Sequence, residues 1–542
     1  MKADPGKKGC SMSFGDLALK IGMLLVFFGI MIYVGFYCRK HSTDVKGFVL
    51  GGRNVGPWLT AFAYGTSYFS AVIFVGYAGQ FGWKFGIAST WIGIGNAVIG
   101  SLMAWVILGR RTRVMTQKLS SATMPDFFGK RFNAPSLKIA ASIIIFIFMI
   151  PYTASLYNGL SRLFGMAFNI DYSVCVIAMA VLTAIYVIVG GYMATAVNDF
   201  IQGLIMLVGI VAVIAAVLGS KGGFMESLKG LSAVSDPTIA NGDVPGVFNS
   251  FFGPDPLSLL GVVILTSLGT WGLPQMVGKF YAIKSEGSIH KGTIISTVFA
   301  IIVAGGCYFL GGFGRLFSEE LGAAAGGNPQ GGFDNVIPTM LSNLSPFLMA
   351  VVIILVLSAS MSTLSSLVLT SSSTVTLDLI KGRISRNMDE KKQLFTMRVL
   401  ILVFIVISAA LAIVQAKSSV AFIAQAMGVS WGAMAGAFLA PFLYGLYWKR
   451  ATAASCWVSM LFSSVFMTLD MLVNLKVINI SLGFLQSPIN AGAFCMIAGL
   501  VLVPLISLIT KAPDKALVSD IFASYQRKVV VTAKDSIGTE EA

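Results

Sequence analysis

The chain contains 542 residues, of which 56% are hydrophobic and only 11% are charged. Soluble domains carry about 25% charged residues, so this composition excludes an ordinary cytosolic or secreted protein. The formal net charge of +15 fits basic residues in the cytoplasmic loops of a membrane protein. We therefore expect contact with a lipid bilayer and no nucleic-acid partner.

Thirteen apolar runs follow one another along the chain, each long enough for the roughly 20 residues that cross a bilayer. They predict an all-α polytopic membrane protein with about 13 transmembrane helices. The predicted helices are 18–37, 55–79, 85–109, 137–165, 171–190, 194–219, 255–281, 292–317, 345–377, 394–416, 418–448, 452–475 and 488–510.

The basic residues are distributed unevenly among the connections between these helices. Most of the 38 Lys and Arg fall in alternate connections, whereas the connection 319–344 has none. By the positive-inside rule, this pattern predicts an amino terminus outside the cell and a carboxyl terminus in the cytoplasm. We expect a multi-pass protein of the plasma membrane, specifically of a bacterial inner membrane.

Two predicted helices contain interruptions. Helix 55–79 has a run of small polar residues at 65–70, and helix 255–281 contains two glycines followed by Pro274. A simple proline kink or close helix packing would explain either interruption alone. The two helices are five helices apart, however, so they are equivalent first members of two five-helix repeats of opposite orientation. Such paired interruptions indicate a binding site near the bilayer midplane.

An acidic residue, Asp199, lies in helix 194–219 at a depth of roughly 12 Å. A carboxylate at this depth costs several kcal/mol unless it is paired, hydrated or bound to an ion. Helices 55–79, 194–219 and 345–377 contain no Lys or Arg, so we expect a bound cation as its partner. The alternative is a carboxyl group that faces a watery vestibule or bonds to the backbone.

Helix 345–377 carries hydroxyl groups on one face. Ala359, Ser362 and Thr363 stand at positions i, i+3 and i+4. Hydroxyl and carbonyl oxygens form a neutral cage that suits a hard monovalent cation such as sodium, whereas magnesium or calcium would usually recruit more carboxylates. The alternative is that these residues serve helix packing.

At these positions the chain resembles the sodium/solute symporter family. The matching segments are Gly51-Gly52-Arg53, Ser70-Ala71 with Gly76, Tyr186 with 190–194, Asn198-Asp199 with Gln202, and 359–365. The resemblance covers about residues 20–510. It implies a leucine-transporter-like fold of two inverted five-helix repeats with added helices.

The resemblance also implies site residues and an organisation into segments. The family's shared sodium site would use the carbonyls of Thr66, Phe69 and Ala359 and the hydroxyls of Ser362 and Thr363, with Asp199 near it and holding a second sodium in some members. The whole chain, 1–542, is then one transport domain. Its expected segments are 1–53 (amino-terminal segment and extra helix), 54–219 (first repeat), 254–449 (second repeat), 450–510 (two additional helices) and 511–542 (cytoplasmic tail).

The departures from the family bear on the solute. Helix 85–109 lacks the acid of the family's sugar carriers, which disfavours a sugar. A tryptophan of the proline carrier is replaced at Ile264, Leu265 or Thr266, depending on register, which puts proline in doubt. An amino acid or small organic acid is favoured. Candidate solute contacts, each of which could equally be packing residues, are Tyr68, Ser70, Tyr152, Thr270, Trp271, Gln275, Gln425 and Trp431.

These features predict sodium-coupled secondary active symport of a small polar organic solute into the cell by alternating access. The chain has no GxxxxGK[ST] phosphate loop, so uphill transport would draw on an ion gradient. We expect no enzyme activity, no cofactor and no metal other than Na+ as coupling ion. The alternatives are a transporter-fold solute sensor and an uncoupled facilitator or channel; only about 30 residues follow the last helix, so we expect no attached kinase module.

Overall fold

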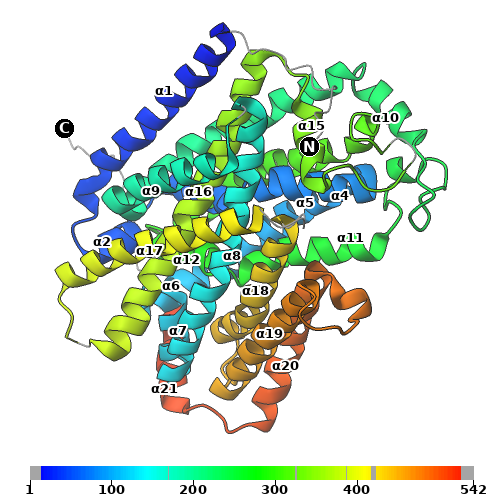
Figure 1. Cartoon of the computed structure of the whole chain (residues 1–542). Coiled ribbons are helices and arrows are strands. Elements are labelled where there is room, and N and C mark those ends of the chain that lie inside the picture. The colour runs from blue at the N-terminus through cyan, green and yellow to red at the C-terminus, as the bar shows by residue number, and fades with distance from the viewer. Residues whose placement is uncertain (1–13, 169, 324–325, 386, 417–422, 527–542) are drawn as a thin grey trace, which may run out of the picture.

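The computed structural model describes residues 14–168, 170–323, 326–385, 387–416 and 423–526. Regular structure in these ranges is helical, apart from one isolated bridge between Val55 and Ile283. This confirms the all-α polytopic class (Figure 1). The α-helices are α1 (Phe14–Cys38), α2 (Val45–Leu50), α3 (Pro57–Tyr68), α4 (Ala78–Phe85), α5 (Thr90–Gly95), α6 (Arg110–Lys118), α7 (Met124–Arg131), α8 (Pro135–Phe168), α9 (Tyr172–Ser220), α10 (Phe224–Ser232), α11 (Pro256–Val263), α12 (Pro274–Ala282), α13 (Gly287–Ala300), α14 (Gly306–Gly311), α15 (Val336–Leu341), α16 (Pro346–Thr374), α17 (Glu390–Ala416), α18 (Ile423–Tyr447), α19 (Ala453–Asn474), α20 (Pro488–Ile509) and α21 (Lys515–Ala523).

Eleven helical stretches of the described chain are long and apolar enough to cross a membrane. The sequence predicts about thirteen, and the difference has two causes. One continuous stretch, Val72–Lys118, holds the second half of predicted helix 55–79 together with predicted helix 85–109. The helix predicted at 171–190 contributes a shorter apolar segment, Tyr172–Ile185.

The helices predicted at 171–190 and 194–219 form one long element, α9, which is interrupted at Gly191. The backbone of Gly191 has φ 57° and ψ −154°, a combination that is open essentially to glycine alone. A Cβ atom at this position would lie 2.8 Å from the ring of Phe48. The chain therefore changes direction at a single residue, without a loop between the two helices.

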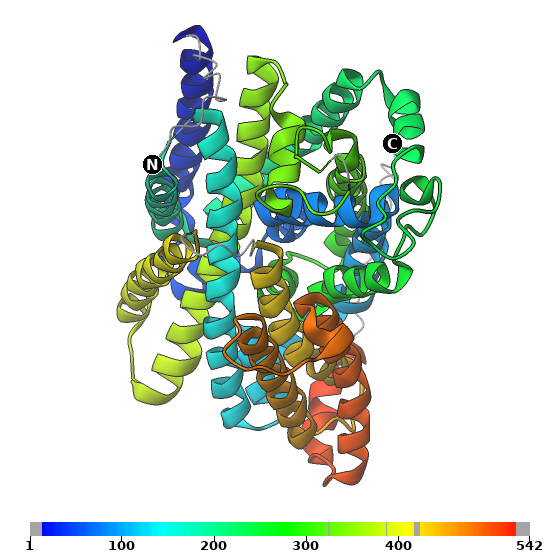
Figure 2. The same cartoon turned by 45° about the vertical axis from the view of Figure 1, so that its right-hand side comes forward.

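The most buried of the candidate membrane segments is Gln425–Tyr447 in α18, at 94%, against 22% for Gly15–Cys38 in α1. Helices α19 and α20 pack along α18, and α1 lies at the periphery (Figures 1 and 2). Glycines permit a close crossing of α18 and α20: a Cβ atom at Gly432 would lie 2.7 Å from the Cα atom of Gly492. Small residues at membrane helix contacts allow this approach. The start of the predicted helix 418–448 lies partly outside the described residues.

One end of the molecule is covered by the short helix α21. Ile521 and Phe522 are buried, and the guanidinium of Arg131 lies 5.1 Å from the Phe522 ring centroid. An ion pair of 2.7 Å joins Lys118 to Asp520. The segment after the last membrane helix is thus packed against the ends of α6 and α7.

The opposite end is held together by a buried ion pair between Arg315 and Asp236, with 2.9 Å between Nη1 and Oδ2. The guanidinium lies 3.9 Å from the Phe248 ring centroid and donates from Nε to the carbonyl of Trp83. Burial raises the pKa of Asp236, but hydrogen bonds from Thr238, Arg315 and backbone N–H groups outweigh it and hold this pKa below its usual value. The cluster ties two connecting segments to α4.

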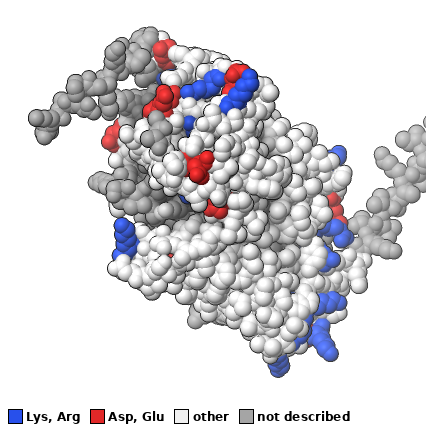
Figure 3. All heavy atoms as spheres, turned by 90° about the vertical axis from the view of Figure 1, so that its right-hand side faces the viewer, with Lys and Arg blue, Asp and Glu red and all other residues white. Residues whose placement is uncertain are grey.

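Lys and Arg side chains gather at the lower right of the space-filling view, whereas acidic side chains are more frequent at its upper end (Figure 3). This uneven distribution agrees with the alternation of basic connections along the sequence. The assignment of the basic end to the cytoplasm stays a prediction. We call it the predicted cytoplasmic end below.

Candidate sodium and solute site

The interruption predicted in helix 55–79 is confirmed. Helix α3 ends at Tyr68, and Phe69 has extended backbone with φ −85° and ψ 120°. Helical structure resumes at Ala71 and continues through a π-helical segment, Val72–Tyr77. The N–H of Ala71 donates to Oγ of Ser360 at 3.3 Å. The break is therefore attached to α16, and the carbonyls of the last turn of α3 have no following turn of N–H groups to pair with.

The interruption predicted in helix 255–281 is confirmed as well. Helix α12 begins at Pro274, and Leu273 before it has extended backbone with φ −84° and ψ 121°. These angles match those of Phe69 within one degree. Gly272 is needed here because a Cβ atom would lie 2.8 Å from the backbone nitrogen of Leu439 in α18. Two breaks of the same geometry thus occur in the first helices of the two predicted repeats.

The first break and α16 together bring five oxygen atoms into one buried cluster. Oγ1 of Thr363 lies 3.2 Å from the carbonyl oxygen of Thr66, 3.1 Å from that of Phe69 and 3.1 Å from that of Ala359. Oγ of Ser362 lies 3.2 Å from Thr66 O and 3.1 Å from Ala359 O. All five residues are buried. We call these five atoms the oxygen cluster.

The oxygen cluster contains more acceptors than donors. Each hydroxyl carries one proton, so Ser362 and Thr363 together supply two protons for contacts to three carbonyl oxygens. No charged side chain contacts the cluster among the described residues. A dehydrated monovalent cation would complete such a neutral, all-oxygen arrangement. The five atoms predicted as sodium ligands are therefore together, and sodium binding there stays a prediction.

Asp199 has a protein partner that the sequence pattern did not reveal. Its Oδ2 lies 3.5 Å from the ammonium of Lys279 in α12, and both residues are buried. The expectation that Asp199 lacks a basic partner is therefore corrected, because it rested on three predicted helices and Lys279 belongs to a fourth. A lysine inside the apolar run 255–281 is itself costly, and this signal could have identified the pair.

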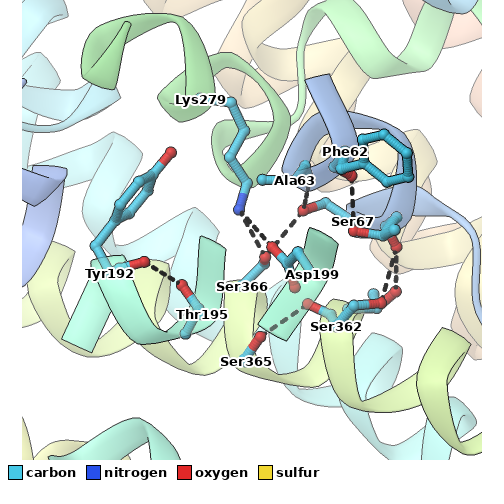
Figure 4. Close-up of polar contacts among 12 residues, drawn as sticks. Phe62, Ala63, Ser67, Tyr192, Thr195, Asp199, Lys279, Ser362, Ser365 and Ser366 are labelled. Atoms are coloured by element: carbon cyan, nitrogen blue, oxygen red, sulfur yellow. Dashed lines mark hydrogen bonds and ion pairs between the residues drawn. The ribbon is translucent and has the colours of Figure 1, made fainter. Parts of the chain in front are cut away.

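The ammonium of Lys279 is held by further groups (Figure 4). It donates to Oγ of Ser366 at 3.0 Å, and Ser366 shares a hydrogen bond of 2.9 Å with Ser67. The ring centroid of Tyr192 lies 5.3 Å from the ammonium. Asp199, Lys279, Ser366 and Ser67 form a second polar group, which we call the lysine cluster. It joins α3, α9, α12 and α16.

Three of the predicted solute contacts lie together beside the first break. The Tyr152 and Trp431 rings meet edge to face, with centroids 6.0 Å apart, and the Tyr152 hydroxyl faces Ser70 Oγ and Trp431 Nε1. None of these three polar atoms has a hydrogen-bond partner of good geometry among the described residues, although all three are buried. Unpaired buried polar groups are rare and need an explanation, and a bound solute supplies one.

The remaining predicted solute contacts are placed differently. Thr270 donates to the Gly100 carbonyl at 3.1 Å, and Trp271 donates to the Ile99 carbonyl at 2.9 Å. Their polar atoms thus form hydrogen bonds between the segments Gly269–Trp271 and Asn96–Met103. Gln275 is buried with both amide atoms unpartnered among the described residues, whereas Gln425 is half-buried near the start of α18. The side chain of Tyr68 lies outside the described residues.

A cavity opens at the predicted cytoplasmic end. It measures about 690 Å³ and is lined by basic and acidic side chains, including Arg53, Lys138 and Asp378. A smaller cavity shares three lining residues with it and extends to Gln275 and Lys279. The lysine cluster is thus approached from this end of the molecule.

Comparison with curated proteins finds relatives that match most of the chain. The osmoregulated proline transporter of Bacillus subtilis is 29% identical over 500 residues, 91% of this chain and 95% of the relative. The sodium/proline symporter of Salmonella typhimurium is 30% identical over 461 residues, 83% and 88% of the two chains. A sodium/proline symporter of Staphylococcus aureus is 31% identical over 442 residues, 80% and 82%.

Comparison with solved structures tests the predicted fold. A Na+-coupled sialic acid symporter, in a substrate-bound outward-open state, superposes with a TM-score of 0.74 over 93% of this chain and 99% of the other, at 17% identity. This confirms the leucine-transporter-like fold of two inverted five-helix repeats. The family model described as "Sodium:solute symporter family" matches residues 48–463. The chain is a member of the sodium:solute symporter family, and is therefore a multi-pass membrane transporter and not an enzyme.

Proposed function

We propose that this chain imports a small amino acid or organic acid together with Na+, and that L-proline is the first solute to test. The observation that carries the proposal is the oxygen cluster, in which two hydroxyls of α16 meet carbonyls released by the break after α3. The three named relatives transport proline. We give this similarity over most of the chain more weight than the absence of a tryptophan at Ile264, Leu265 or Thr266, because that difference concerns a single side chain.

Sodium would act by joining the broken segment after α3 to α16. In the oxygen cluster, only two hydroxyl protons are available for the hydrogen bonds between them. A cation among Thr66 O, Phe69 O and the α16 hydroxyls would hold the broken segment against α16. The solute would lie on the other side of the same break, at Ser70 and Tyr152. Sodium binding and solute binding would then stabilise one arrangement of the broken helix, so each would raise the affinity for the other by the same factor.

The polar atoms beside the break suit a carboxylate. Ser70, Tyr152 and Trp431 offer two O–H groups and one N–H group, and charge-assisted hydrogen bonds from such donors are the stronger kind. The rings of Tyr152 and Trp431 provide apolar surface for an aliphatic side chain or ring. A sugar would instead need several acceptors that contact its hydroxyls.

Transport into the cell requires release at the cytoplasmic end. The larger cavity at the predicted cytoplasmic end and the smaller one that extends to Gln275 and Lys279 would provide the path for this release. The amino terminus would lie outside the cell, as the basic connections predict.

The test is uptake of radiolabelled L-proline by proteoliposomes that contain the purified chain. We expect accumulation when an inward Na+ gradient is imposed and none when K+ replaces Na+. A thermal-shift panel of amino acids and organic acids, each in Na+ and in K+, identifies the solute if proline is not carried, because a ligand of the native state raises its apparent stability. A solute that equilibrates equally in both salts would refute coupling.

A further inference from the structure

The oxygen cluster and the lysine cluster differ in charge: only the second contains charged groups, the Asp199 carboxylate and the Lys279 ammonium. In the oxygen cluster, Ser362 and Thr363 contact carbonyl oxygens and no cationic group. In the lysine cluster, the ammonium of Lys279 lies 3.0 Å from Ser366 Oγ and 3.5 Å from Asp199 Oδ2. Two buried oxygen-rich groups thus contact α16, one without charged side chains and one with a buried ion pair.

The Lys279 ammonium lies between hard oxygen atoms of α9 and α16. A buried carboxylate and two hydroxyl groups, at Asp199, Ser366 and Ser67, are hard oxygen ligands suited to Na+. The ammonium carries the same charge as Na+ and contacts two of these oxygens, Asp199 Oδ2 and Ser366 Oγ. Adding Na+ beside it would place two positive charges against one buried carboxylate, which mutual repulsion opposes.

We propose that Lys279 is a tethered cation that fills the second cation position of this transporter, so that the chain binds one Na+ for each solute, at the oxygen cluster. This inference rests on the proposed function and adds its sodium stoichiometry. Lys279 would then determine that stoichiometry, because its covalently attached ammonium takes the place of a second, exchangeable Na+. The alternative is an ion pair that only fastens α9 to α12.

The two interpretations differ in the number of Na+ ions bound when the lysine is removed. Lys279→Gln leaves the Asp199 carboxylate without a partner among its present neighbours, and Na+ would enter to replace the lost charge. If Lys279 served only to fasten helices, its loss would weaken the fold without creating a site.

The experiment is equilibrium binding of ²²Na+ to the purified full-length protein, measured as moles per mole. We expect about one Na+ in the wild type, about two in Lys279→Gln, and about one in Lys279→Arg, since arginine keeps the tethered charge. The Asp199→Asn/Lys279→Gln double variant returns to one. Lys221→Gln is the control: it removes a lysine from the more exposed ion pair with Glu320, where water replaces the lost partner, so the count stays unchanged.

Two further variants keep the proposal open to refutation if Lys279→Gln does not fold. Ser366→Ala retains the ion pair and keeps the count at one, whereas Ser362→Ala/Thr363→Ala abolishes binding. Two ions in the wild type, an unchanged count in folded Lys279→Gln, or a lower count in Ser366→Ala would each overturn the proposal. Failure of the proposed function itself has a different signature, namely no Na+ bound to the folded wild type.

Discussion

Thr363 is the hydroxyl that connects the oxygen cluster, and we expect Thr363→Val to weaken sodium binding without unfolding the protein. The Thr363 oxygen contacts all three carbonyls at 3.1–3.2 Å, whereas the Ser362 oxygen contacts two. Valine has the same shape and keeps the packing of the buried side chain. The substitution therefore removes one of five ligand oxygens and little else.

The size of the effect follows from the worth of one oxygen contact to a charged group. Such contacts contribute about 1.5–3 kcal/mol, and every 1.4 kcal/mol is a tenfold change in an equilibrium constant. Thr363→Val should raise the Na+ concentration for half-maximal effect roughly 10- to 150-fold. Ser362→Ala removes an oxygen that touches only two of the carbonyls, so its effect should lie at the lower end of this range.

The assay is solute uptake by proteoliposomes across a series of Na+ concentrations, with the sodium-dependent thermal shift of the purified protein as a second measure. Ser372→Ala is the control, because its buried hydroxyl on the same helix bonds only to the Leu369 carbonyl. An unchanged sodium requirement in folded Thr363→Val would refute the assignment of the oxygen cluster as the sodium site.

Three further outcomes are expected. Asp199→Asn should destroy coupled transport and destabilise the protein by about 3–5 kcal/mol, because it leaves Lys279 buried and unpaired. The double variant with Lys279→Gln should regain thermal stability. A double variant that melts no higher than Asp199→Asn would argue against the ion pair. Gly272→Ala should destabilise the protein by about 1–3 kcal/mol through contact with the α18 backbone, whereas Gly278→Ala, with nothing within 4 Å, should be silent in the same melting experiment. The folded-state pKa of Asp236 is lowered, so the stabilising effect of its carboxylate is present at neutral pH and is lost as the pH falls through that pKa. As the pH is lowered from about 7 to 3, the melting temperature should fall steeply in the wild type and less steeply in Asp236→Asn. Parallel profiles of the two proteins would contradict this.

The oxygen cluster could be predicted because its signals are local. Ala359, Ser362 and Thr363 share one face of a helix by their spacing alone, and the break near Phe69 is visible as a run of small polar residues. The resemblance to the family supplied the pairing of these two segments. Paired breaks in two helices, five helices apart, likewise carried the prediction of inverted repeats.

The partner of Asp199 could not be read from spacing, because Lys279 is 80 positions away and no periodicity relates the two residues. Depth in an apolar run shows that each charge needs a partner, but the fold decides which group supplies it. Thr270 and Trp271 show the same limit. Their types suit a binding site, yet the packing of the short segment Gly269–Trp271 against Asn96–Met103 directs both polar groups to backbone carbonyls.

The ammonium of Lys279 has a bioenergetic consequence. A charge that stays with the protein contributes nothing to net charge movement, so the membrane would act on one translocated ion per neutral solute. At 100 mV and a tenfold Na+ gradient, one ion supplies about 3.7 kcal/mol, enough for a solute ratio of several hundred. Two ions would support about 10⁵-fold accumulation. With one coupling ion in place of two, the chain would lose steep accumulation and would use half the sodium for each solute molecule.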